Sequence, residues 1–172
     1  MSFTFLVEDG TGLTGATSYA SVAEADAYLA QNIHVLPTWR TLPSTTKQAL
    51  LAWASRYLDQ RANWYGTRTK ANSGLRWPRT GVRDLDGNAI GSTVVPREVK
   101  AATIEMARYL IAEDRSDDRS QDALKELQVD VIKLVFDNSY RLPEVPNEIQ
   151  FILRGLGTIS AGRPTHAKIV KA

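Results

Sequence analysis

One segment of this chain interrupts the helical periodicity on either side of it and limits the folds that the chain can adopt. It runs from Ala62 to Val95, is rich in glycine and contains Pro78. An irregular segment of that length is uncommon inside a compact domain, where it is either ordered by packing or functional. We therefore expect residues 62–95, called the brace loop below, to be ordered against the helices that flank it.

Apolar residues spaced three and four apart predict helices before and after the brace loop. The first helix begins after Ser21, because Ser21 and Glu24 have the spacing of a capping box. The segment that follows, residues 32–43, contains two prolines and is predicted to be a linker. A longer helix then runs from Ser44 to about Arg61, and its polar face is expected to carry Lys47, Arg56 and Asp59.

Two more helices and one β element are predicted after the brace loop. The third helix starts at Pro96, whose missing amide costs nothing in a first turn, and the last lies in residues 147–157. Alternating apolar residues predict a strand from Leu127 to Phe136. The predicted fold is mainly α: a small bundle of about four helices with an ordered brace loop, a short β element near 127–136 and extended termini.

Composition indicates one domain. The chain has 172 residues, a net charge of +2, no cysteine and no apolar run near the roughly 20 residues that cross a membrane. We expect a single domain over residues 1–157, a flexible basic tail over residues 158–172, and synthesis in a reducing cytoplasm. Acidic residues dominate the beginning of the chain, and none follows Glu148. Such asymmetry often marks contacts with other molecules, for which the basic candidates are Arg154, Arg163, Lys168 and Lys171.

The letters Asp-Leu-Asp-Gly-Asn at residues 84–88 raise the possibility of a metal site. The spacing does not match an EF-hand loop, and Asp86-Gly87 is better interpreted as a tight turn. A metal nuclease could combine Asp84 or Asp86 with Glu98 and Lys100. However, Glu98 and Lys100 fall in the third helix, where their side chains would point roughly 200° apart. We expect no enzyme activity, no cofactor and no metal.

Basic and aromatic residues alternate in and before the brace loop, which leaves two interpretations open. From Arg56 to Arg83 the sequence contains seven basic residues and a single acidic one. Trp64, Tyr65 and Trp77 lie among them. Such a surface could bind single-stranded DNA, since aromatic rings stack on unpaired bases and cations follow the phosphates. The residues for this alternative are Arg68, Lys70, Arg76, Trp77 and Arg79.

The other interpretation is a structural brace, which the nearly neutral charge of the chain favours. It assigns a packing role to Trp77 and Pro78, near Trp53 and Met106. Asp86-Gly87 then turns the chain, and arginines bind carboxylates or carbonyls. The brace residues are Trp77, Pro78, Arg79, Asp86 and Gly87, with Arg76 and Arg83 as further arginines that find partners.

Five blocks of the sequence, in order, resemble a family of tailed-phage head–tail connector (adaptor, or head-completion) proteins. They are VEDGTGLTGATSYASVAEADAYLA, ALLAWASRYLD, WYGTRT, LRWPRTGVRDLDGNAIG and VPREVKAATIEMARYL, and together they cover roughly residues 5–112. The same family is also labelled DnaT-like single-stranded-DNA-binding.

The resemblance implies a structural virion protein at the head–tail junction. Members of that family are small and mainly helical, and they form a ring, commonly of twelve copies, beneath the portal protein. The ring extends the DNA channel without sequence specificity and joins the portal to a neck or tail protein. Extended terminal segments of such proteins often dock on neighbouring copies or on the portal. Because no acid follows Glu148, we hypothesise that the basic tail is an arm that contacts the portal, a neighbouring copy or DNA. Single-stranded-DNA binding remains the alternative function.

Overall fold

The computed structural model describes residues 3–34, 36–112, 114 and 143–159, together with the backbone of two strands at 126–129 and 132–135. Within these residues the fold is mainly helical, as predicted. The helices are α1 (Val22–Leu29), α2 (Leu36–Thr41), α3 (Ser44–Arg61), α4 (Arg97–Ala112) and α5 (Asn147–Leu153). None of the described helices is both long enough and apolar enough to cross a membrane.

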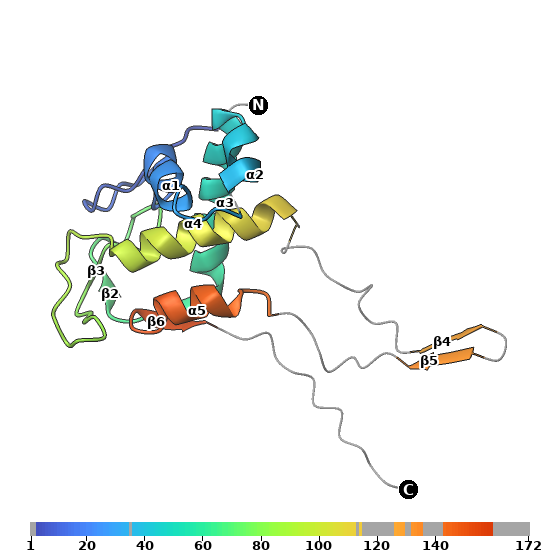
Figure 1. Ribbon diagram of the computed structural model, residues 1–172. Helices are drawn as coiled ribbons and strands as arrows, with labels where there is room; N and C mark the ends of the chain where they lie inside the picture. Colours follow the sequence, from blue (N-terminus) through green and yellow to red (C-terminus); the bar gives the residue numbers. More distant parts are fainter. Residues whose placement is uncertain are drawn as a thin grey trace, which may run out of the picture.

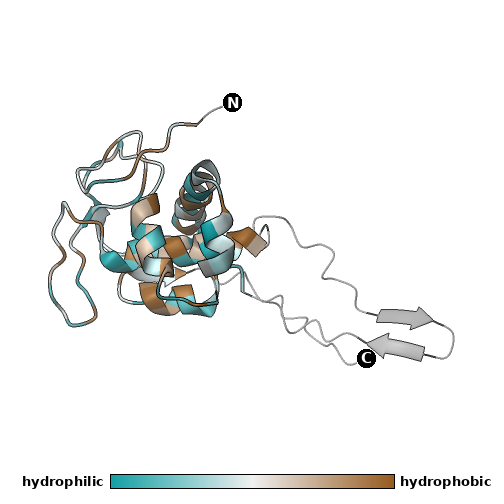
Figure 2. Ribbon diagram, turned by 45° about the horizontal axis from the view of Figure 1, so that its top comes forward, coloured by the Kyte–Doolittle hydropathy of each residue, from teal (hydrophilic) through white to brown (hydrophobic). Residues whose placement is uncertain are grey.

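The packing centre is the crossing of α3 and α4, which Figure 1 shows at the middle of the molecule. The α1 helix packs against both of them, and α5 packs against α4. Apolar residues of α3 and α4 at helical spacing fill the core. They include Leu51, Leu58, Val99 and Met106, which are fully buried. Figure 2 shows brown, apolar stretches along the helices at the centre of the molecule. The core therefore lies on the apolar stripes that the sequence predicts.

Local signals place the helix ends. At α1, the Ser21 hydroxyl accepts from the Glu24 amide and the Glu24 carboxylate accepts from the Ser21 amide, which confirms the predicted capping box. The predicted bounds of α3 are those observed, and Pro96 lies just before α4, where its carbonyl accepts from the Lys100 amide. These ends are determined by neighbouring residues and are therefore readable from the sequence.

The predicted linker at residues 32–43 was wrong, because it contains α2. Pro37 occupies the first turn of this helix, where a proline is tolerated, so it does not prevent helix formation. Trp39 anchors the helix: its side chain is 1% exposed and its Nε1 donates to the Asp26 carboxylate at 2.6 Å. Burial of one large aromatic side chain thus decided a segment that local propensity left undetermined.

In the part of the chain that the structure describes, three pairs of short antiparallel strands accompany the helices. In the brace loop, β1 (Ala62–Trp64) pairs with β6 (Gly157–Ile159), and β2 (Thr67–Arg68) pairs with β3 (Arg79–Thr80). The β element predicted near 127–136 is present, but as two strands, β4 (Glu126–Val129) and β5 (Ile132–Val135), rather than one. Alternation of period two is the same in both strands of an antiparallel pair, so it does not reveal where one strand ends and the next begins.

The pairing of β6 with β1 extends order past the predicted domain end at residue 157, since Thr158 and Ile159 are part of the strand. The rest of the predicted tail, residues 160–172, lies outside the described residues, as do its candidate contact residues Arg163, Lys168 and Lys171. Arg154, the remaining candidate, is exposed at the C-terminal end of α5.

Candidate nucleic-acid interface

Trp77 and Pro78 of the brace loop are buried, and the Trp77 side chain has no exposed surface. The ring packs edge-to-face on Trp64, with 5.9 Å between ring centroids. This aromatic neighbour differs from Trp53 and Met106, the neighbours expected from the sequence. A fully buried ring cannot stack on a base, so Trp77 does not belong to a nucleic-acid surface.

Arg79 is enclosed by backbone carbonyls of the brace loop. Its Nε donates to the Tyr65 carbonyl at 2.6 Å, and its terminal nitrogens donate to the carbonyls of Trp64, Gly66 and Arg76. Burial lowers the pKa of this guanidinium from its ordinary value, and the nearby charge of Arg68 acts in the same direction. Because its donors are already engaged, Arg79 holds the loop together and does not present charge to a ligand.

A buried hydrogen-bond network ties the brace loop to α3 and to the segment before α1. The Tyr19 hydroxyl donates to the Asp59 carboxylate at 2.7 Å and accepts from the amides of Arg76 and Trp77. Asp59 also accepts from the Arg76 amide and from Trp64 Nε1, each at 3.0 Å. We call Tyr19 and Asp59 the anchor pair, because together they fix the backbone position of residues 76–77.

The anchor pair corrects the prediction for α3, which placed Lys47 and Asp59 on a polar outer face. Asp59 is 8% exposed and Lys47 is 9% exposed. Burial raises the pKa of the Asp59 carboxyl above its ordinary value, although the hydrogen bonds from Tyr19, Arg76 and Trp64 act in the opposite direction. A lone carboxylate in a helix gives no local signal of a partner 40 positions away, so this pair was missed.

The residues 84–88 form the predicted turn. Gly87 adopts a φ of +85°, which favours glycine, and the Asp84 carboxylate accepts from the amides of Asp86 and Asn88. Hydrogen bonds from Asn88 lower the pKa of the Asp84 carboxyl. Arg83 donates to the Gly87 carbonyl at 2.7 Å. The Asp84 carboxylate thus stabilises the turn. The described residues contain no cluster of three or more potential metal ligands.

The carboxylates of the candidate nuclease site and its lysine belong to different local arrangements. Glu98 pairs with the adjacent Arg97 at 2.8 Å, and Lys100 pairs with Glu24 of α1 at 2.7 Å. Asp84 is engaged in the turn described above, and Asp86 is exposed. The structure does not bring the four residues into one site.

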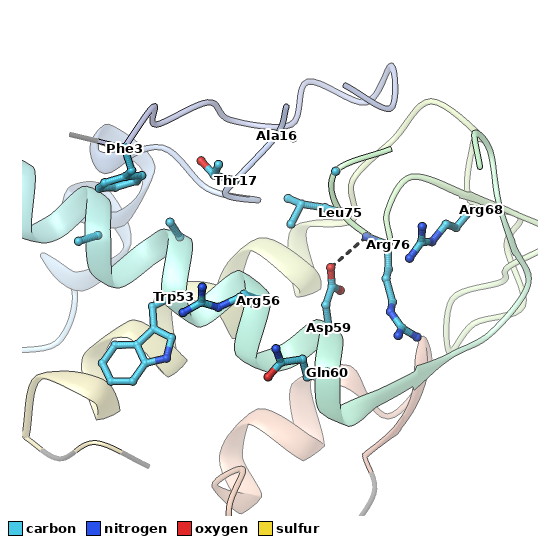
Figure 3. Close-up of a pocket in the computed structure, with 13 residues that line it drawn as sticks. Phe3, Ala16, Thr17, Trp53, Arg56, Asp59, Gln60, Arg68, Leu75 and Arg76 are labelled. Carbon is cyan, nitrogen blue, oxygen red and sulfur yellow. Dashed lines mark hydrogen bonds between the residues drawn. The ribbon is translucent and has the colours of Figure 1, made fainter. Parts of the chain in front are cut away.

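A groove of about 580 Å³ lies between α3, the N-terminal segment and the brace loop. Figure 3 shows its side chains: Phe3 and Trp53 toward one end, Arg68 and Arg76 toward the other, and Arg56 and Gln60 between them. Asp59 of the anchor pair lies at the floor. The anchor pair therefore also positions Arg76: it binds the Arg76 backbone amide and so holds the side chain of this residue at the edge of the groove.

The groove is basic. Arg56, Arg68 and Arg76 are exposed, and none of them takes part in an ion pair or a cation–π contact within the described part of the chain. Among the described residues that line the groove, Asp59 is the only acid, and its oxygens are occupied by Tyr19, Trp64 and the Arg76 amide. Three guanidinium groups without carboxylate partners therefore face a shared space, which is the composition expected of an anion-binding surface.

The walls of the groove are joined by direct backbone contacts. The Gly74 amide of the brace loop donates to the Leu13 carbonyl at 2.9 Å. A Cβ at Gly74 would lie only 2.6 Å from the Ala16 carbonyl oxygen, so this close approach requires glycine. The N-terminal wall is itself held by the buried Glu8 carboxylate, which accepts from the amides of Gly10, Gly12 and Leu13. The groove is thus preformed rather than created by a mobile flap.

The structure revises the residue set of the DNA-binding alternative. Arg68 and Arg76 line the groove, and Lys70 is exposed on the same loop, where its stem lies near Gly12. Trp77 and Arg79 were wrong, because both are buried. Sequence reasoning missed Trp53, Arg56 and Phe3. The spacing of three between Trp53 and Arg56 places them on one face of α3, and this was the available signal.

These features define a small, mainly helical protein with a preformed, basic groove that has an aromatic end. The chain belongs to the family described as "Putative DnaT-like ssDNA binding protein", whose model matches residues 3–172. No curated protein and no solved structure matches the chain. The family description names single-stranded DNA and not a head–tail connector, so it agrees with the alternative function predicted from the sequence better than with the adaptor.

Proposed function

We propose that this protein binds single-stranded DNA in the groove between α3 and the brace loop. The observation that carries the proposal is the set of three exposed guanidinium groups, Arg56, Arg68 and Arg76, around a groove whose only carboxylate is already hydrogen-bonded. Unpaired cations attract phosphates, and an accessible indole on the same helix adds a surface on which a base can stack. The family description supports this proposal.

The mechanism is electrostatic attraction followed by docking into a preformed site. Phosphate contacts release condensed counterions, so the affinity should fall as the salt concentration rises. With three arginines engaged, the slope of log K against log salt is expected to be about −2 for a single strand. A groove already held by Gly74 and Glu8 should need little rearrangement on binding.

Fluorescence anisotropy with a labelled oligothymidylate tests the proposal. Replacing Arg56, Arg68 and Arg76 together by glutamine should abolish most of the binding and flatten the salt dependence. The control is Arg40→Gln, which removes an exposed cation of α2 outside the groove and should leave binding unchanged. Equal binding by the triple variant and the wild type would refute a role for this groove.

The head–tail adaptor is the second candidate, and exposed apolar side chains away from the groove favour it. Ile33 is 77% exposed and Phe151 is 67% exposed, which suits residues that become covered in an assembly. On this reading, copies of the chain form a ring on a portal protein in the virion. Mixing the protein with purified portal and measuring particle mass tests it: a large defined complex supports the adaptor, and an unchanged mass contradicts it.

A further inference from the structure

Trp53 differs from the other three tryptophans of this chain. Trp39, Trp64 and Trp77 are 1%, 7% and 0% exposed, and the first two donate their ring N–H to carboxylates. Trp53 is only half-buried, and it lines the groove. A large apolar ring left partly in water, beside exposed cations, is the arrangement that base stacking requires.

Trp53 and two of the three arginines, Arg68 and Arg76, lie apart along the groove. Trp53, Arg56 and Gln60 lie at positions i, i+3 and i+7 of α3 and so share one helix face. The distance along the helix from Trp53 to Gln60 is about 10 Å, at 1.5 Å per residue. Arg68 and Arg76 lie beyond Gln60, at the end opposite Phe3 and Trp53 (Figure 3).

This separation relates to the dimensions of a nucleic-acid strand. Stacked nucleotides advance by about 3.4 Å each along one strand, so about three of them span the distance from Trp53 to Gln60. A base at Trp53 and a phosphate at Arg68 or Arg76 therefore belong to different nucleotides of the same strand. Including the lining at both ends, the groove suits a segment of about three to five nucleotides.

We propose that the groove has two subsites: a base stacks on Trp53, and phosphates of the same unpaired strand bind Arg68 and Arg76. This inference rests on the proposed function. It adds the path of the bound strand along α3, the number of nucleotides that the groove holds, and the residue on which a base stacks. The ligand class is an unpaired strand, because the bases of a duplex are already stacked on each other and cannot reach the indole. No base preference is expected, since every base has a face that can stack.

Tryptophan fluorescence tests the base subsite directly, because acrylamide should reach Trp53 more readily than the three buried rings. Bound oligothymidylate should protect Trp53 from acrylamide and quench its emission. Trp53→Leu should lose this signal and weaken binding, measured by anisotropy, about tenfold to a hundredfold. Phe151→Leu is the control, since it removes an exposed ring of α5 outside the groove and should change neither readout.

A length series tests the footprint. Affinity for oligothymidylates of two to ten nucleotides should rise steeply up to about five nucleotides and then only in proportion to the number of binding positions. A duplex of the same length should leave Trp53 accessible to acrylamide. A steep rise that continued to ten nucleotides would contradict the short groove.

The outcomes separate this inference from the proposed function. If no oligonucleotide binds the wild type, both fail. If binding requires the three arginines but Trp53 stays accessible and Trp53→Leu binds normally, the proposed function holds and the base subsite is wrong. Circular dichroism checks the fold of Trp53→Leu, and if that variant does not fold, protection of Trp53 in the wild type decides the question.

Discussion

Two arginines of the brace loop, three positions apart, have opposite roles. Arg79 is enclosed by the carbonyls of residues 64, 65, 66 and 76, whereas the side chain of Arg76 is exposed at the groove. Arg79 fixes the backbone of the loop from the interior, and Arg76 presents its charge to the groove. The role of an arginine in this loop therefore depends on whether its donors are already engaged.

Removing the enclosed arginine should have the largest effect. Arg79→Ala leaves several carbonyls without a charged donor, so the free energy of unfolding should fall by about 2–4 kcal/mol. Arg79→Lys should recover only part of it, since a lysine cannot donate in several fixed directions. In urea titrations, Arg76→Gln should cost less than about 0.5 kcal/mol and instead weaken DNA binding. Equal destabilisation by Arg76→Gln and Arg79→Ala would remove the distinction.

The contact between the two groove walls should give the next largest effect. In Gly74→Ala the new methyl group would overlap the Ala16 and Thr14 carbonyls, which lie 2.6 and 2.8 Å from its ideal position. We expect a loss of about 1–3 kcal/mol in the free energy of unfolding and weaker oligonucleotide binding as the walls separate.

Gly15→Ala is a matched control for that variant. Its added methyl would meet only the Leu6 side chain at 3.6 Å, an ordinary contact. Thermal unfolding and anisotropy should therefore resemble those of the wild type. Similar losses in both alanine variants would show that neither wall tolerates an added methyl group, and would not single out Gly74 as the residue that joins the walls.

The anchor pair should give the smallest change and a distinctive pH dependence. Asp59→Asn places an amide among donors and should cost about 1–2 kcal/mol of stability near pH 4. Because the folded-state pKa of Asp59 is raised above 3.8, its contribution is fully present below that value and is lost as pH rises through the folded-state pKa. The stability difference between wild type and Asp59→Asn should therefore shrink as pH increases, which urea titrations at several pH values can measure.

An opposite trend would indicate that hydrogen bonds from Tyr19, Trp64 and Arg76 outweigh the burial of Asp59. The difference would then grow as pH rises. Tyr19→Phe, which removes only the hydroxyl, serves as a control, since it should destabilise the brace loop without introducing a new amide.

Prediction from sequence was most successful where neighbouring residues decide the outcome. Spacing of three and four residues predicts α3 and α4, and the turn at Gly87 follows from a residue that tolerates positive φ. It was least successful for α2, where Pro37 and Pro43 suggested a linker and the burial of Trp39 produced a helix. Sequence alone has the same limit at the site. Trp77 and Trp53 have the same side chain, and only their packing in the fold makes one buried and the other accessible at the groove.

Local sequence patterns are sufficient to predict a mainly helical chain, the capping of α1, an ordered loop between α3 and α4, and a local excess of positive charge. Which of those charges are available depends on contacts between distant positions, and these exist only in the folded chain. Tyr19 and Trp77 are 58 residues apart, and Gly74 meets Leu13 across a similar separation. Periodicity in the sequence gives information on residues that are close along the chain. That Arg79 lies in the interior and Arg76 at the groove depends on how distant segments pack, so it could be seen only in the folded structure.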